Sequence, residues 1–160
     1  MNKLILLAFL FTSVTLWSQS SLDMTSKNGD QVIKLNISNF IKMIDLSYND
    51  WEATVKRIGY EHIQTDGQFE DFQKGSYEKK NSHWIGKGRI KPQVNFISYG
   101  NEDKSDVNRL IEELKVYYLK NIETGEMVFA VPKGNYYYQF VVQRKNTFSD
   151  VIVVSKFPKQ

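Results

Sequence analysis

The sequence predicts an α+β fold in which an antiparallel sheet carries helices on one face. Aromatic residues make up 14% of the chain and include nine tyrosines, and aromatic side chains favour strands. Three segments place apolar residues at the spacing of an amphipathic helix. Several others alternate apolar and polar residues between turn signals, which is typical of antiparallel strands.

Residues 1–20, MNKLILLAFLFTSVTLWSQS, have the order of a secretory signal peptide. Lys3 precedes an apolar run, and small polar residues follow it. The run of about 13 residues is shorter than the roughly 20 that a membrane-spanning helix needs. We therefore expect cleavage and export to the periplasm or the exterior, with an uncleaved N-terminal anchor as the alternative. The chain has no cysteine, so we expect neither lipoprotein processing nor any stable membrane anchor after cleavage.

Removal of the leader leaves about 140 residues, the length of one ordinary domain. We expect residues 21–30 to form a flexible tether, because they are small and polar. Residues 31–160 are expected to fold as a single α+β domain. The formal net charge of +3 falls by one to +2 without Lys3, and this balance does not favour nucleic-acid binding.

The sequence of the first part of the domain predicts two short helices joined by a tight turn. Ser38 can cap a helix that ends near Leu46. Asn49 and Glu52 form a capping-box pair that opens the second helix. Gly59 stands where a left-handed residue ends a helix. Three strands, separated by turn signals that include Pro92, are then expected over residues 72–80, 83–90 and 93–99.

The longest helical pattern comes next and precedes a second set of strands. Val107, Leu110, Leu114 and Tyr118 share one helical face, and Asp106 lies near the positive end of the helix dipole. Three strands are expected after it, over residues 127–131, 136–145 and 151–157. The repeated order predicts two helix-plus-three-strand halves, residues 38–99 and 101–157. A single sheet of mixed origin with helices on one face is the alternative.

The helix pair, carried by FIKMIDLSYNDWEATVKRIGY, and the meander after it resemble the beta-lactamase-inhibitor-protein-like fold and the small outer-membrane-assembly lipoproteins that share it. In that group each unit begins with a helix pair that ends in a glycine, matched here by Gly59, and presents a sheet face to a partner. The chain departs from the group at Tyr60, where a proline often follows the glycine, and in the single helix of its second half. The resemblance implies an exported bacterial binding protein, and it carries over no binding residue.

No motif for catalysis, for a metal or for a cofactor stands out. The only histidines, His62 and His83, lack a zinc-ligand spacing, and the chain has neither a cysteine nor a G-x-S-x-G elbow. We therefore expect a non-enzymatic binding or interaction module of the bacterial envelope or exterior. The alternatives are a small exported hydrolase whose carboxylates are assembled by the fold, and an accessory factor in envelope assembly.

A basic stretch is the first candidate binding surface. Lys87, Arg89 and Lys91 alternate along an expected strand and would line one face of it. Tyr77 and Trp84 lie close by in the sequence. Such a face could bind an anionic polysaccharide or an acidic protein partner. The alternative is a sheet face or edge that its lysines keep soluble.

A run of tyrosines is the second candidate surface. Tyr136, Tyr137 and Tyr138 occupy both faces of an expected strand, so at least one ring should point away from the core. Exposed tyrosines suit contacts with proteins or sugars. If other elements cover both faces, the rings belong to the core instead.

Overall fold

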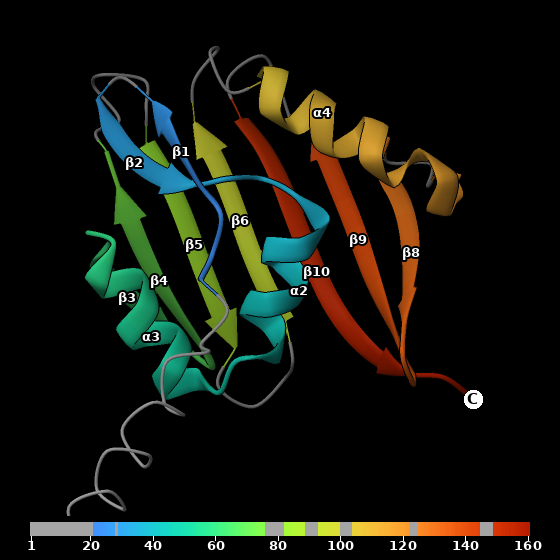
Figure 1. The fold of residues 1–160 in the computed structure, drawn as a ribbon, viewed down its shortest axis with the longest axis horizontal. Coiled ribbons are helices and arrows are strands. Elements are labelled where there is room, and N and C mark those ends of the chain that lie inside the picture. Colours follow the sequence, from blue (N-terminus) through green and yellow to red (C-terminus); the bar gives the residue numbers. More distant parts are fainter. Residues whose placement is uncertain are drawn as a thin grey trace, which may run out of the picture.

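An eight-stranded antiparallel sheet with helices on one face forms the body of the protein (Figure 1). The computed structural model describes residues 21–27, 29–75, 82–88, 93–99, 104–121, 125–144 and 149–160. The strand order is β3-β4-β5-β6-β10-β9-β8-β7, and every pair of neighbours is antiparallel. The α+β fold predicted from the sequence is therefore confirmed.

The described residues form helices, a 3₁₀ turn, the large sheet and a separate hairpin. The helices are α2 (Ile37–Asp45), α3 (Tyr48–Arg57) and α4 (Lys104–Leu114), with the 3₁₀ turn η2 (Lys115–Tyr117) after α4. The large sheet contains β3 (Glu61–Asp66), β4 (Phe69–Lys74), β5 (Ser82–Gly88), β6 (Gln93–Tyr99), β7 (Tyr118–Asn121), β8 (Met127–Lys133), β9 (Tyr136–Arg144) and β10 (Ser149–Pro158). The hairpin contains β1 (Met24–Lys27) and β2 (Asp30–Ile33).

Each half of the chain contributes a meander of four strands rather than the expected three. The last strand of each meander lies at the centre, where β6 pairs with β10, so the two halves share one continuous sheet. The strands that the sequence did not predict, β3 and β7, are the two outermost strands of this sheet. Both are exposed and interrupted by an irregularity in register. An edge strand needs no alternating apolar face, so its sequence pattern is weak.

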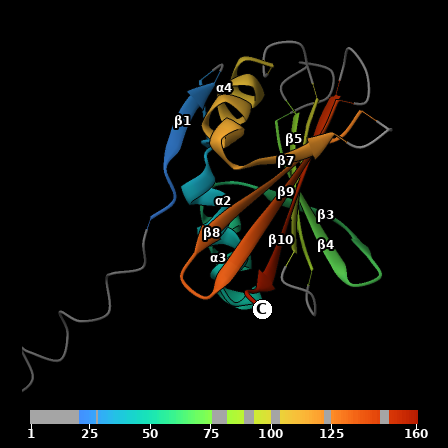
Figure 2. The same ribbon diagram turned by 90° about the vertical axis from the view of Figure 1, so that its right-hand side faces the viewer.

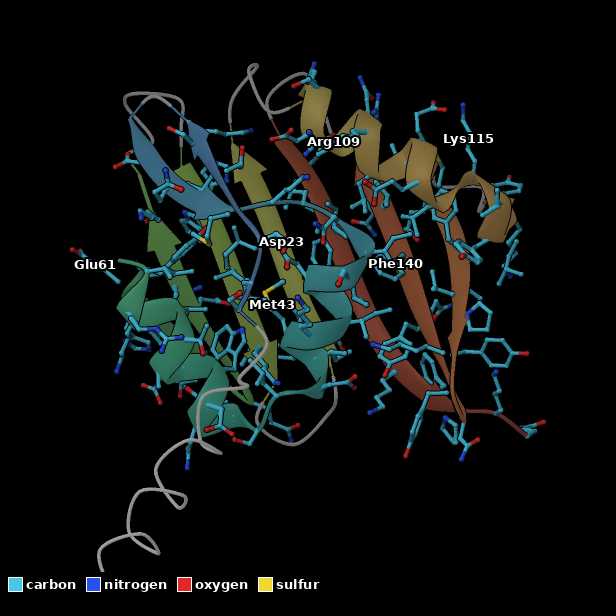
Figure 3. All side chains as sticks on the ribbon, viewed as in Figure 1. Asp23, Met43, Glu61, Arg109, Lys115 and Phe140 are labelled. Carbon is cyan, nitrogen blue, oxygen red and sulfur yellow. The ribbon has the colours of Figure 1, made fainter. Side chains whose placement is uncertain are left out.

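The flexible tether that the sequence predicted over residues 21–30 is not observed in the described part of this range, residues 21–27, 29 and 30. Residues 24–27 pair with residues 30–33 in the β1–β2 hairpin. The fully buried side chain of Asn39 on α2 holds the chain on both sides of the hairpin. Before the hairpin, its oxygen accepts the Asp23 amide at 2.9 Å and its nitrogen donates to the Asp23 carbonyl at 2.8 Å. After the hairpin, the same nitrogen donates to the Lys34 carbonyl at 2.8 Å. Asp23 lies beside α2 (Figure 3). Hydrogen bonds between the backbone of this polar segment and the buried Asn39 side chain therefore fix it in place. The composition of the segment gives no sign of these bonds.

Both helices of the first half are capped two residues earlier than the sequence predicted. The side chain of Asn36, not Ser38, accepts the amide at the start of α2. Likewise Ser47, not Asn49, caps α3. The expected glycine after the second helix is confirmed, because Gly59 has a φ of 87°. A polar residue two positions upstream competes equally well for the cap, so sequence alone places the helix but not its first residue.

Buried aromatic pairs fix the helices on the sheet. Trp51 of α3 packs edge-to-face on Phe72 of β4 with ring centroids 5.3 Å apart. Phe40 of α2 packs in the same way on Phe140 of β9 at 5.7 Å, and Figure 3 labels Phe140 next to α2. All four rings are fully buried. Truncating such a ring costs about 3–5 kcal/mol, so these contacts hold every helix of the first half on the same side of the sheet.

Candidate functional site

The side of the sheet opposite the helices carries no described element (Figure 2). Along β9, Phe140 is buried against α2, whereas its neighbours Gln139 and Val141 are half-buried. Because successive strand residues point to opposite faces, Gln139 and Val141 lie on the side away from the helices. We call this side the open face.

The open face has an apolar stripe along its central strands. The pairing register sets Val153 of β10 opposite Val141, and Phe157 opposite Tyr137. Trp84 of β5 is half-buried and lies on the same face, because it alternates with His83 and Ile85, which are buried on the helix side. The described apolar side chains of this face are Trp84, Ala130, Tyr137, Val141, Val151, Val153 and Phe157, together with Val128, which is buried with 1% of its surface exposed.

The stripe ends at the rings of Tyr137 and Phe157, where the β8–β9 turn meets the end of β10. A third exposed ring, Tyr136, lies there on the helix side of the sheet, because it alternates with Tyr137 and shares a face with Tyr138 and Phe140. Tyr136, Tyr137 and Phe157 are 41%, 43% and 48% exposed. The amide of Lys159 donates to the carbonyl of Asn135 at 2.9 Å, which ties the end of the chain to this turn. The two segments meet at the corner marked C in Figure 1. We call these three rings, together with Lys133 and Lys156 on the helix side and Lys159 beside Tyr137, the aromatic corner.

Two lysines lie over the exposed tyrosine rings. The Lys156 ammonium is 4.1 Å from the centroid of the Tyr136 ring, and the Lys159 ammonium is 5.2 Å from that of Tyr137. Both distances are within the range of cation–π attraction. Lys156 also donates to the Asp45 carboxylate at 2.7 Å, and this hydrogen bond raises the pKa of Lys156. Each cation therefore contacts a ring that stays partly exposed.

The structure divides the three predicted tyrosines between the surface and the core. Tyr136 and Tyr137 are exposed, whereas Tyr138 is only 2% exposed and faces α2. The Tyr138 hydroxyl donates to the Asp45 carboxylate at 2.9 Å. Burial, followed by this interaction with Asp45, raises the pKa of Tyr138. Tyr138 therefore fits the description of a core tyrosine with a polar tip, and only its two neighbours can meet a partner.

Lys87 does not belong to an exposed basic face, so this part of the sequence-based prediction is wrong. Its side chain is buried beneath α2, and its ammonium donates to the carbonyls of Met43 at 2.7 Å and Leu46 at 2.5 Å. Lys87 thus satisfies carbonyls that the end of α2 leaves without partners. Burial lowers the pKa of Lys87 to about 8, although the nearby carboxylates of Asp45 and Asp50 oppose this shift.

Trp84, the one other candidate residue of the basic stretch that the structure describes, does not share a surface with Lys87. Trp84 lies on the open face, opposite to the side on which Lys87 is buried. Tyr77, Arg89 and Lys91 lie outside the described residues. Alternation along a strand shows which side chains share a face with Lys87, because every second residue points to the same side. It does not show which of the two faces a helix covers.

One polar cluster bears on the alternative of an enzyme. The His62 Nε2 atom is 2.7 Å from the buried Glu70 carboxylate, and the Thr65 hydroxyl donates to the same carboxylate at 2.9 Å. In a catalytic triad the hydroxyl donates to the imidazole, and the carboxylate holds the other ring nitrogen. Here one nitrogen of His62 faces both groups, with Thr65 at 3.5 Å. The cluster therefore ties β3 to β4 and does not arrange a nucleophile.

The described residues lack the features of a metal site and of a membrane-spanning helix. Among the described residues, no three side chains of the histidine, cysteine, aspartate and glutamate types gather as a metal site would require. None of the described helices has the length and apolar character needed to span a membrane.

Comparison with protein-family models, with curated proteins and with solved structures finds no match to the chain. The resemblance to beta-lactamase-inhibitor-protein-like proteins accordingly stays a prediction.

Proposed function

We propose that this protein is an exported, non-enzymatic binding module that docks a protein partner on its open face. The observation that carries the proposal is the asymmetry of the sheet. Helices bury one face, while the other keeps half-buried aliphatic side chains and ends in the exposed rings of Tyr137 and Phe157. Export is inferred from the leader-like residues 1–20.

The composition of this face supports contact with a protein. Aromatic residues are enriched in protein interfaces, where a few central rings contribute most of the binding energy. Tyr137 and Phe157 are opposite each other in the register of β9 and β10, so they offer adjacent apolar surface. The half-buried Val141 and Val153 continue this surface toward the middle of the sheet. A flat partner surface can therefore contact the rings and the aliphatic stripe together.

Site-specific photocrosslinking tests the proposal. A photoreactive phenylalanine at position 157 or 137 should give one crosslinked adduct of defined mass when the protein is made in its own cells. The same residue at position 116 is the control, because Val116 is 82% exposed but belongs to η2. Equal adducts from position 116, or none from positions 137 and 157, would contradict docking on the open face.

A further inference from the structure

We infer that the β1–β2 hairpin is an acid-sensitive cover, which protonation of His83 beneath it releases from the large sheet. The hairpin lies in the helix layer, in front of β4 and β5 in Figure 1. Its second strand buries the side chains of Val32 and Ile33, each 2% exposed. The hairpin is on the helix side of the sheet (Figure 2), so its release does not depend on docking at the open face.

Two lysines attach the turn end of the hairpin to the elements around it. The Lys27 ammonium of β1 is 2.5 Å from the Asp106 carboxylate of α4. The Lys74 ammonium of β4 donates to the carbonyl of Gln31 in β2 at 2.6 Å. The other end of the hairpin is held by the side chain of Asn39, an amide that does not titrate. A change of charge can therefore act on one end of the hairpin while the other end stays attached.

His83 lies among the charged groups of this attachment. Its side chain is 3% exposed on β5 and stands opposite Lys74 in the β4–β5 register. Two lysines and two aspartates act on it and balance one another, so a proton on the imidazole adds a positive charge to a buried, balanced set. The charged groups around His83 are Lys27 and Asp30 of the hairpin, Lys74 of β4, Asp106 of α4 with its second partner Arg109, and Asp150 of β10, which follows Ser98 of β6 in the same row across the sheet.

The burial of His83 makes the attachment depend on pH. Burial, followed by the charge of Lys27, lowers the pKa of His83 to about 4. Release of the hairpin admits water to the imidazole and removes Lys27, which returns the pKa toward the ordinary value of about 6.5. The released state then binds a proton that the docked state does not, so falling pH favours release. From pH 7 to pH 5, these two pKa values predict a rise of about 20-fold in the equilibrium constant for release.

Native-state hydrogen exchange of the full chain at pH 7 and pH 5 is the test. The measured quantity is the protection factor, the exchange rate of each amide in an unfolded chain at the same pH divided by its observed rate. A two-stranded hairpin is at best marginally stable alone, so release should expose its amides. We expect the hairpin amides to lose about 20-fold in protection at pH 5, and to be less protected at both pH values than the amides of β6 and β10.

Two variants assign the effect to one imidazole. In His83→Gln the hairpin protection should differ between the two pH values by less than about twofold, because glutamine does not titrate. His62→Gln is the matched control, since His62 is the only other histidine and is exposed on β3. This control should keep the 20-fold loss.

Three outcomes would overturn the inference. The first is hairpin protection that does not change between pH 7 and pH 5. The second is equal protection of the hairpin and of β6 and β10, because the hairpin would then open only with the whole fold. The third is a loss that persists in His83→Gln, which would assign the effect to another group such as Asp150, whose pKa is raised by burial. The first two outcomes are measured on the unsubstituted protein, so they decide the matter even if a variant fails to fold.

Discussion

Replacement of Asn39 by leucine should release the N-terminal hairpin from the domain. The amide of Asn39 is fully buried on α2 and makes three hydrogen bonds to the backbone of Asp23 and Lys34. Leucine has nearly the same shape but can make none of these bonds. The substitution therefore isolates the polar contribution of one side chain to the attachment of residues 21–34.

The size of the effect follows from these three contacts. A hydrogen bond within a protein contributes about 1 kcal/mol net, and a buried backbone group left without a partner costs about 1–3 kcal/mol. Three lost bonds therefore predict a fall in the free energy of unfolding of about 3 kcal/mol. For a domain of this length each kcal/mol shifts Tm by about 3 °C, so Asn39→Leu should lower Tm by about 10 °C.

Thermal unfolding and hydrogen exchange together measure this prediction. Tm should fall as stated, and the amides of the β1–β2 hairpin should exchange faster than those of the large sheet. Asn49→Leu is the control, because Asn49 is exposed on α3 and its replacement should change stability by less than about 0.5 kcal/mol. A Tm for Asn39→Leu within 2 °C of the control, roughly the effect of half a kcal/mol, would refute the reasoning.

Three further predictions concern the sheet. Lys87→Met should lower the free energy of unfolding by about 2 kcal/mol in urea at pH 7, because the carbonyl of Leu46 loses its donor; an unchanged midpoint would contradict this. Burial, followed by the charge of Lys27, lowers the pKa of His83 to about 4. Below pH 6.5 the unfolded chain binds a proton at His83 that the folded chain does not, so the free energy of unfolding should fall by about 3 kcal/mol from pH 6.5 to pH 4. If a His83→Gln variant loses stability equally steeply with falling pH, His83 is not the cause. Gly86→Ala should cost about 1 kcal/mol, because a Cβ there would collide with the Asp71 carboxylate; the loss should disappear in a G86A/D71A double-mutant cycle.

The sequence predicted the elements whose apolar pattern is strong. The helix stripe of Val107, Leu110 and Leu114 is buried on α4, and the alternation of Phe140 and Val142 is buried on β9, as expected. Tyr118, the last residue of the expected stripe, is not helical, because α4 ends at Leu114 and Tyr118 begins β7. The elements that it missed lack such a pattern. Strands β3 and β7 are outermost in the sheet, and the β1–β2 hairpin depends on hydrogen bonds from Asn39, which is distant in sequence.

The candidate site was predictable only in part. The run of tyrosines indicated rings on both faces of a strand, and the structure exposes Tyr136 and Tyr137. Phe157 and Lys159 were not predicted as site residues, because the register that sets Phe157 opposite Tyr137 depends on which strands pair. Lys87 was assigned to the surface by its charge. Its long aliphatic stem allows burial while the ammonium reaches carbonyls at the end of α2.

The affinity of the crosslinked partner for the variant Y137S/F157S tests the central claim most directly. Isothermal titration with the purified partner should show at least a hundredfold loss of affinity relative to the unsubstituted protein, since two aromatic anchors are removed from the interface. Val116→Ser, which changes an exposed apolar side chain on η2, should leave the affinity within about twofold. Equal affinities for the two variants would show that the open face is not the surface through which this protein binds.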